Sequence, residues 1–124
     1  MKKEIAEIWI AALESGKYEQ TTGMLKKVIM GNVGYCCLGV LCDISGLGTF
    51  GEISGLGTFP VYILPNGNLG ACALPVEVLE WADMSDSVGC FIKTDDSETL
   101  SELNDSGYTF DQIAAIIRNN YKAL

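Results

Sequence analysis

The longest apolar stretch of the chain is YCCLGVLCDISG, residues 35–46. The first polar residue after Tyr35 is Asp43, so this segment lacks the polar stripe that a surface helix shows. The pattern predicts a short central helix that is enclosed on every side. We expect it to end at Gly46, because glycine readily adopts the left-handed conformation that closes a helix. The flanking segments should each lay one apolar face on this helix.

Amphipathic patterns predict one helix near each end of the chain. Residues 3–15 place apolar side chains mostly on one face and glutamates mostly on the other, and Gly16 follows them. In residues 109–124, Thr109 and Gln112 form a capping box, a common signature of a helix start. The inner face of this last helix should consist of Ile113, Ile116, Ile117 and Tyr121.

Two shorter helices are predicted in the second half of the chain. Pro75 opens a helix in LPVEVLEWADM, residues 74–84, since proline fits the first turn of a helix. Ser97 or Asp96 should cap the other helix, TLSELN, at residues 99–104. The apolar positions of the first of these helices are Val76, Leu79 and Trp81.

Strand patterns complete the predicted fold. Residues 17–34 favour a hairpin because of their β-branched residues and glycines. Residues 61–64 and 69–73 flank PNGN, the strongest short hairpin signal in the chain, and residues 87–93 have the pattern of a further strand. The elements follow no βαβ rhythm, so the sequence predicts an α+β fold. We expect a single domain, residues 1–124, with a small antiparallel sheet packed with four to five helices.

A perfect tandem repeat interrupts this pattern. The string ISGLGTF occupies residues 44–50 and recurs as residues 53–59. Solenoid repeats are longer, about 20 to 50 residues, and need at least three copies, so this duplication predicts an enlarged loop at residues 44–59. Residues 46–51 also fit the nucleotide-binding string G-x-G-x-x-G. We interpret this as a chance match, because the fingerprint needs a strand before it and a helix after it.

Composition narrows the classes of function. The net charge is −8 with only eight basic residues, which argues against DNA or RNA as a partner. Glutamates interrupt the apolar start of the chain, which therefore does not resemble a secretory signal. No apolar run approaches the roughly 20 residues that cross a bilayer. We expect a soluble protein of the cytoplasm that binds neither DNA nor a membrane.

The cysteines and the lack of histidine bear on metals and catalysis. Five cysteines in apolar settings, without a secretory signal, are expected to be reduced, buried thiols. The chain has no C-x-x-C pair and no histidine, so we expect no metal site. It also lacks Ser–His and Cys–His nucleophile pairs, and its carboxylate clusters are typical of solvated surface. We therefore predict no catalytic residues, no cofactor and no enzymatic activity.

Three side chains are candidates for ligand binding. Arg118 is the only arginine, and a guanidinium suits a phosphate or a stacked base, although it could equally complement a helix C-terminus. Phe91 lies in a predicted strand and could form an aromatic platform or simply belong to the core. Asn104 could close a helix, or its amide could read a base edge or a ribose.

Three motifs of the chain resemble a known family. YCCLGVLCD, LPVEVLEWA and LSELNDSGYTFDQIA fit the patterns Y-C-C-L-G-V-L-C-D, L-P-x-E-V-x-E-W-A and L-x-E-L-N-D-S-G-x-x-F-x-x-I-A, in this order. These patterns are those of small phage proteins identified as Thoeris anti-defence sponges. The resemblance covers about residues 2–13 and 18–124, apart from the duplicated loop.

The resemblance implies a protein that sequesters glycocyclic ADP-ribose, a signal made by bacterial TIR-domain immune enzymes, without cleaving it. It implies a homodimer or larger homo-oligomer with ligand pockets between protomers, in the cytoplasm of the bacterial host. Some members also bind cyclic oligonucleotides at separate sites. By motif, Phe91 would stack the base, Asn104 and Arg118 would hold polar parts of the ligand, and Trp81 would support them.

The resemblance also makes Lys26 and Lys27 candidates for a second anionic site, at positions where arginine is expected in other members. One alternative from a different class stays open. The net charge of −8 also suits an acidic phage protein that inhibits a host protein by direct contact, as DNA mimics do.

Overall fold

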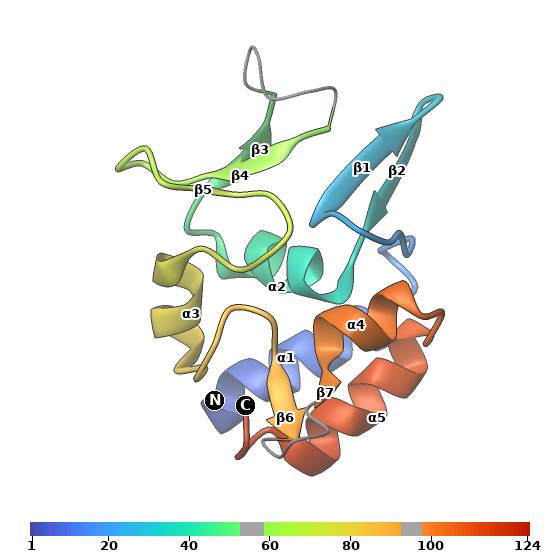
Figure 1. Ribbon diagram of the computed structural model, residues 1–124, viewed down its shortest axis with the longest axis vertical. Helices are drawn as coiled ribbons and strands as arrows, with labels where there is room; N and C mark the ends of the chain where they lie inside the picture. Colours follow the sequence, from blue (N-terminus) through green and yellow to red (C-terminus); the bar gives the residue numbers. More distant parts are fainter. Residues whose placement is uncertain (53–58, 93–97) are drawn as a thin grey trace.

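The computed structural model describes residues 1–52, 59–92 and 98–124 (Figure 1). These residues form five helices and three small antiparallel sheets, which confirms the predicted α+β class. The helices gather in one half of the molecule, and the two larger sheets project from the other half (Figure 1). The helices are α1 (Lys3–Glu14), α2 (Cys37–Ser45), α3 (Val76–Ala82), α4 (Leu100–Asp105) and α5 (Phe110–Asn120).

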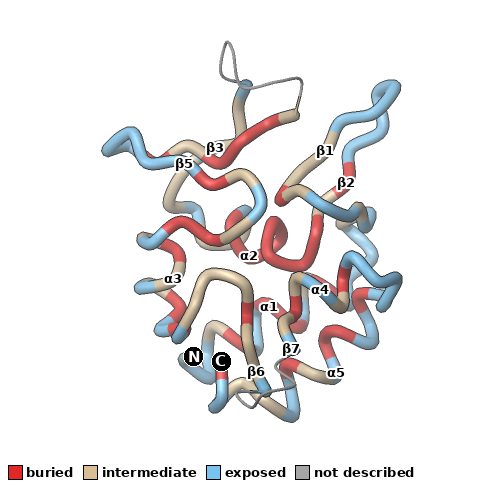
Figure 2. The backbone as a smooth tube through the Cα atoms, viewed as in Figure 1, coloured by how far each residue is buried: buried red, intermediate tan, exposed pale blue. Residues whose placement is uncertain are grey.

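Helix α2 is the centre of the core, as its apolar sequence predicts. Its residues 37–42 are all buried, and Figure 2 shows this helix enclosed in the middle of the molecule. The helix begins where the Cys36 sulfur accepts a hydrogen bond from the Gly39 amide at 3.4 Å. It ends at Gly46, which has the left-handed φ of 66° expected for this position.

Helices α1 and α5 lie side by side, and α1 packs against α2. The predicted capping box at the start of α5 is confirmed, because Thr109 and Gln112 bond to each other's backbone N–H groups. Trp9 in α1 is fully buried, and its indole N–H donates to the Cys37 carbonyl at 2.9 Å. This bond joins the first helix to the central one and satisfies a polar group that would otherwise be buried without a partner.

Two details of the shorter helices differ from prediction. Pro75 precedes α3 as its N-cap, so the helix starts one residue later than expected. Its inward residues are Val78 and Ala82, whereas Val76 is 52% exposed, because it lies two residues before Val78 and so points to the opposite side of the helix. The cap of α4 is Thr99, whose hydroxyl accepts a hydrogen bond from the Glu102 amide at 3.1 Å. The expected caps at residues 96 and 97 lie outside the described residues.

The strands form three separate sheets rather than one. Strands β1 and β2 make a hairpin, β3, β4 and β5 make a three-stranded sheet, and β6 pairs with β7. The bounds are β1 (Lys26–Ile29), β2 (Asn32–Tyr35), β3 (Thr49–Gly51), β4 (Val61–Ile63), β5 (Leu69–Gly70), β6 (Cys90–Ile92) and β7 (Glu98–Thr99).

The predicted strand boundaries need three corrections. The hairpin expected in residues 17–34 is confined to β1 and β2, and the strand expected at residues 87–93 is reduced to β6. The first copy of the repeat is not simply a loop, because its Thr49 and Phe50 continue into β3 and pair with β4. Residues 53–58, in the second copy, lie outside the described residues. Tertiary pairing with β4 explains why a loop-like sequence becomes a strand.

In the parts of the chain that the structure describes, no helix is both long enough and apolar enough to cross a membrane.

Gly39 has a packing role that allows a direct test of the fold. A Cβ atom built on Gly39 would lie 1.8 Å from the Leu25 carbonyl oxygen, which itself accepts the Cys36 amide. Neither backbone can move away without breaking the start of α2. We expect Gly39→Ala to lower the free energy of unfolding by about 3 kcal/mol, measured by urea denaturation.

Gly51→Ala is the matched control for this experiment. Among the described residues, its added Cβ would meet the end of the Ile63 side chain, at 3.1 Å, and no backbone atom. A flexible side chain can yield, so we expect a loss below about 1 kcal/mol. Equal losses for the two variants would contradict the close packing of α2 against Leu25.

Candidate functional site

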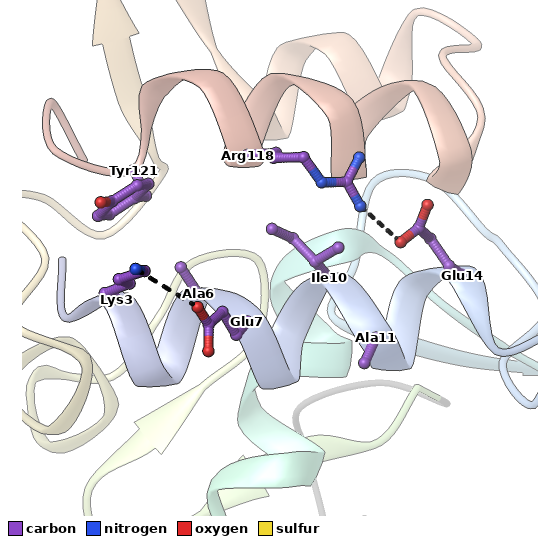
Figure 3. A pocket seen from close by; sticks show the side chains of 8 residues that line it. All are labelled: Lys3, Ala6, Glu7, Ile10, Ala11, Glu14, Arg118 and Tyr121. Atoms are coloured by element: carbon purple, nitrogen blue, oxygen red, sulfur yellow. Dashed lines mark hydrogen bonds and ion pairs between the residues drawn. The ribbon is translucent and has the colours of Figure 1, made fainter.

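A groove runs between α1 and α5 and has a volume of about 450 Å³ (Figure 3). We call it the α1–α5 groove. The side chains of α1 that line it recur every three or four residues, which places them on one face of the helix. The lining residues are Lys3, Ala6, Glu7, Ile10, Ala11, Glu14, Arg118 and Tyr121.

Short side chains and hydrogen bonds at the chain termini shape this groove. Ala6 and Ile10 are buried, and the small side chain of Ala6 leaves space between the helices. The N-terminal ammonium of Met1 donates to the Tyr121 carbonyl at 2.9 Å. The start of α1 is thereby tied to the end of α5, so that the two helices run in opposite directions (Figure 3).

The polar groups of the groove are arranged as two ion pairs. Arg118 contacts Glu14 with 2.8 Å between Nη2 and Oε1, and Lys3 lies 4.0 Å from Glu7. The side chains of Arg118 and Glu14 are 53% and 41% exposed. The Tyr121 ring stands above Lys3 at the opposite end from Arg118 (Figure 3). The groove therefore combines an apolar floor, two cations, two carboxylates and an aromatic ring.

Asn104 lies elsewhere and is completely buried. Its Oδ1 accepts hydrogen bonds from Gln20 Nε2 at 2.9 Å and from the Cys37 amide at 3.1 Å, and its Nδ2 donates to the Thr21 carbonyl at 2.8 Å. The side chain has no exposed atom to offer a ligand. Asn104 therefore acts as a structural clamp, and its expected contact with a ligand stays a prediction.

The rest of the L-N-D-S-G motif supports the same clamp. The Asp105 carboxylate accepts a hydrogen bond from the Gly23 amide at 2.9 Å, and the Tyr108 carbonyl accepts one from Gln20 Nε2 at 2.6 Å. Both bonds hold the segment that leads into β1. Polar groups of Asn104, of Asp105 and of Tyr108, which follows the motif, thus form hydrogen bonds with a segment more than 80 residues away in sequence. These hydrogen bonds give the motif a role in folding.

Phe91 and Trp81 are placed apart from the groove. Phe91 lies in β6 and Trp81 in α3, and both are half-buried with their apolar surface packed against the core. Neither is among the described residues that line the α1–α5 groove. Within one chain, the structure therefore does not bring together the four residues that the resemblance implies.

Lys26 and Lys27 lie beside aromatic rings of the duplicated segment. The Lys26 ammonium is 5.1 Å from the centre of the Phe50 ring and 5.3 Å from that of Tyr35. The Lys27 ammonium is 5.6 Å from the centre of the Phe59 ring. Phe50 and Phe59 are the equivalent residues of the two copies of ISGLGTF. Each lysine thus has a cation–π partner from one copy, and the second anionic site stays a prediction.

The thiols of Cys36, Cys37 and Cys42 are unsuited to nucleophilic chemistry. Burial raises the pKa of Cys36 to about 11, and burial also raises the pKa values of Cys37 and Cys42. These thiols are protonated near neutral pH and so are poor nucleophiles. The expectation that all five cysteines are buried is wrong for Cys72, which is exposed, with its sulfur 3.6 Å from the Met24 sulfur. Among the described residues, no cluster of three potential metal ligands occurs.

Sequence analysis identified Arg118 but missed the groove around it. Glu14 and Lys3 are more than 100 residues away along the chain. The only local signal is the spacing of Lys3, Glu7, Ile10 and Glu14, which places them on one face of a helix. That spacing shows a shared face but not which helix will lie against it.

Comparison with known proteins gives one match. The family model DUF8296, described as a domain of unknown function, matches residues 1–121. No curated protein and no solved structure matches the chain.

The clamp role of Asn104 can be tested by substitution. Asn104→Ala leaves the Cys37 amide and the Thr21 carbonyl without their partner, so we expect the free energy of unfolding to fall by about 3 kcal/mol in urea denaturation. Asn119→Ala, at an exposed position in α5, should change it by less than about 0.5 kcal/mol. Unchanged stability of the Asn104 variant would contradict the clamp.

Proposed function

This chain belongs to the DUF8296 family, and we propose that it is a phage counter-defence protein that sequesters a signalling nucleotide of the cyclic ADP-ribose type without cleaving it. The proposal starts from the three motifs that resemble the Thoeris anti-defence sponges. The observation that carries it is the α1–α5 groove, which joins the only arginine of the chain to a second cation and an aromatic ring.

The size and chemistry of the groove suit such a ligand. Its volume of about 450 Å³ falls within the range of small-molecule sites. The guanidinium of Arg118 can bind two oxygens of a phosphate, and the Lys3 ammonium can act as a second, more flexible cation. The Tyr121 ring offers a face on which a base could stack. A chain with a net charge of −8 needs only these few donors to bind an anion.

Binding without cleavage is favoured by the chemical inventory. The chain has no histidine, so proton transfer near neutral pH would fall to other groups. The thiols of Cys36, Cys37 and Cys42 are buried and protonated. A sponge needs concentration and affinity instead. To hold a signal below the level of submicromolar receptors it needs a Kd of nanomolar order, which corresponds to about −12 kcal/mol.

Self-association is the second part of the proposal. The β1–β2 hairpin projects from the body of the molecule (Figure 1), and its tip exposes apolar side chains. We call this surface the hairpin tip. Its residues, with their exposed fractions, are Val28 at 39%, Ile29 at 52%, Met30 at 96% and Val33 at 40%.

Two features favour a second copy of the chain as the occupant of the hairpin tip. Met30 has a φ of 52°, in a turn where asparagine, aspartate or glycine is normal, so an exposed apolar side chain is kept there despite backbone strain. Residues 26–35 also contain no acidic side chain, so the hairpin itself adds no negative charge to the repulsion between two acidic copies. Phe91 and Trp81 keep their proposed role at the ligand, because the resemblance implies ligand pockets between protomers.

The ligand prediction is tested by retention. The protein is mixed with cyclic ADP-ribose isomers, free ligand is filtered away, the retained fraction is heated, and the released molecule is identified by mass spectrometry. We expect intact ligand from the native protein. Arg118→Ala should weaken binding about tenfold to a hundredfold, the loss expected for a hydrogen bond to a charged group.

Lys122→Ala is the control for that variant, because it removes one positive charge from an exposed position outside the groove. It should bind as the native protein does. Release of a cleaved product would indicate an enzyme. No retention by the native protein would refute the sponge, and salt-sensitive capture of a basic host protein would then favour the acidic inhibitor.

The oligomer prediction is tested at the hairpin tip. Met30→Asp suits the turn conformation but places a charge in the proposed interface, so we expect dissociation to monomers at concentrations where the native protein is a dimer or larger. Size-exclusion chromatography with light scattering measures the mass. Val76→Asp, at a similarly apolar exposed position in α3, should leave the assembly intact. A monomeric native protein would contradict the prediction.

A further inference from the structure

The guanidinium of Arg118 already has an anionic partner before any ligand arrives. Glu14 Oε1 lies 2.8 Å from Nη2, and no other hydrogen-bond partner of this guanidinium occurs among the described residues. From this pair we infer that Glu14 is an internal competitor for Arg118, which a phosphate-bearing ligand must displace. The inference rests on the proposed function, because it concerns the same groove.

Arg118 stabilises the negative charge of the Glu14 carboxylate, because of where Glu14 lies in α1. Glu14 is the last residue of α1, where the unpaired carbonyl groups of the helix carry partial negative charge. The last turn of α1 contains no basic residue to offset this. Arg118, reaching across from α5, supplies the positive charge that α1 itself lacks at this end (Figure 3). The contact is therefore attractive in the empty groove.

The contact is also easily replaced. Both side chains are about half exposed, so a displaced Glu14 carboxylate regains water without further unfolding. Exposed ion pairs of this kind are weak. The pair uses one hydrogen bond from Nη2, whereas a phosphate can bind a guanidinium through two parallel hydrogen bonds. A phosphate-bearing ligand can outcompete Glu14, but an uncharged nucleoside has nothing with which to replace it.

Glu14 affects ligands with phosphate and ligands without phosphate differently. A ligand without phosphate leaves the Glu14–Arg118 pair closed and gains nothing from the guanidinium. A ligand with phosphate replaces Glu14 in the ion pair with Arg118, and the negative charge of the phosphate repels the Glu14 carboxylate. Glu14 therefore lowers the affinity for ligands that carry phosphate and leaves the affinity for uncharged ligands unchanged.

The test uses inorganic pyrophosphate as the probe, with binding measured by isothermal titration calorimetry. Glu14→Gln keeps the size of the side chain and removes its charge, so we expect pyrophosphate to bind about fivefold more tightly than to the native protein. Adenosine, which has no phosphate, should bind both proteins equally within twofold. Glu4→Gln makes the same charge change in the first turn of α1, outside the groove, and should leave the affinity unchanged.

A double variant assigns the effect to Arg118. In the Arg118→Gln background, Glu14→Gln should no longer raise the affinity for pyrophosphate, because the competitor has nothing left to compete for. Equal or weaker binding of pyrophosphate to Glu14→Gln would overturn the inference, as would an equal gain for adenosine or no binding of millimolar pyrophosphate. If Glu14→Gln binds pyrophosphate more tightly but the native protein retains no cyclic ADP-ribose, the inference about Glu14 is supported and the proposed ligand is wrong.

Discussion

The buried amide of Asn104 is the junction on which the arrangement of this molecule depends. It connects α4 to the backbone at Thr21 and to the first residue of α2. A buried amide that loses its partners is costly, so these three segments hold one another in place. The junction lies beside the apolar core around α2 and supplies the directional constraint that apolar packing lacks.

The consequences of this junction extend to the candidate site. Helix α5 begins five residues after α4 ends, so the orientation of α4 limits where α5 can lie. With α5 packed against α1, Arg118 reaches Glu14 and Tyr121 comes to stand above Lys3 (Figure 3). The buried Asn104 thus influences which side chains meet in the groove, although it is not among the residues that line it.

The charged side chains of the groove are paired with each other. Its two carboxylates and two cations neutralise each other in the empty state, so a strongly acidic protein can present cations without exposing a basic surface. The ion pair between Arg118 and Glu14 is exposed and therefore weak, so another anion can take the place of Glu14. The proposed capture and release of a ligand depends on this exchange.

The sequence by itself determined the elements whose signals are local. The apolar run of α2, the stop at Gly46, the capping box of α5 and the PNGN hairpin were all predicted, because each depends on residues within a few positions of one another. The caps of α3 and α4 and the buried face of α3 were predicted less well, because a short helix has few apolar positions to mark its inner face and packing against the core decides it. Only the tertiary structure decided that Asn104 is buried and that Arg118 faces Glu14. Both pairings join residues more than 60 positions apart, and their partners are chosen by how the helices pack.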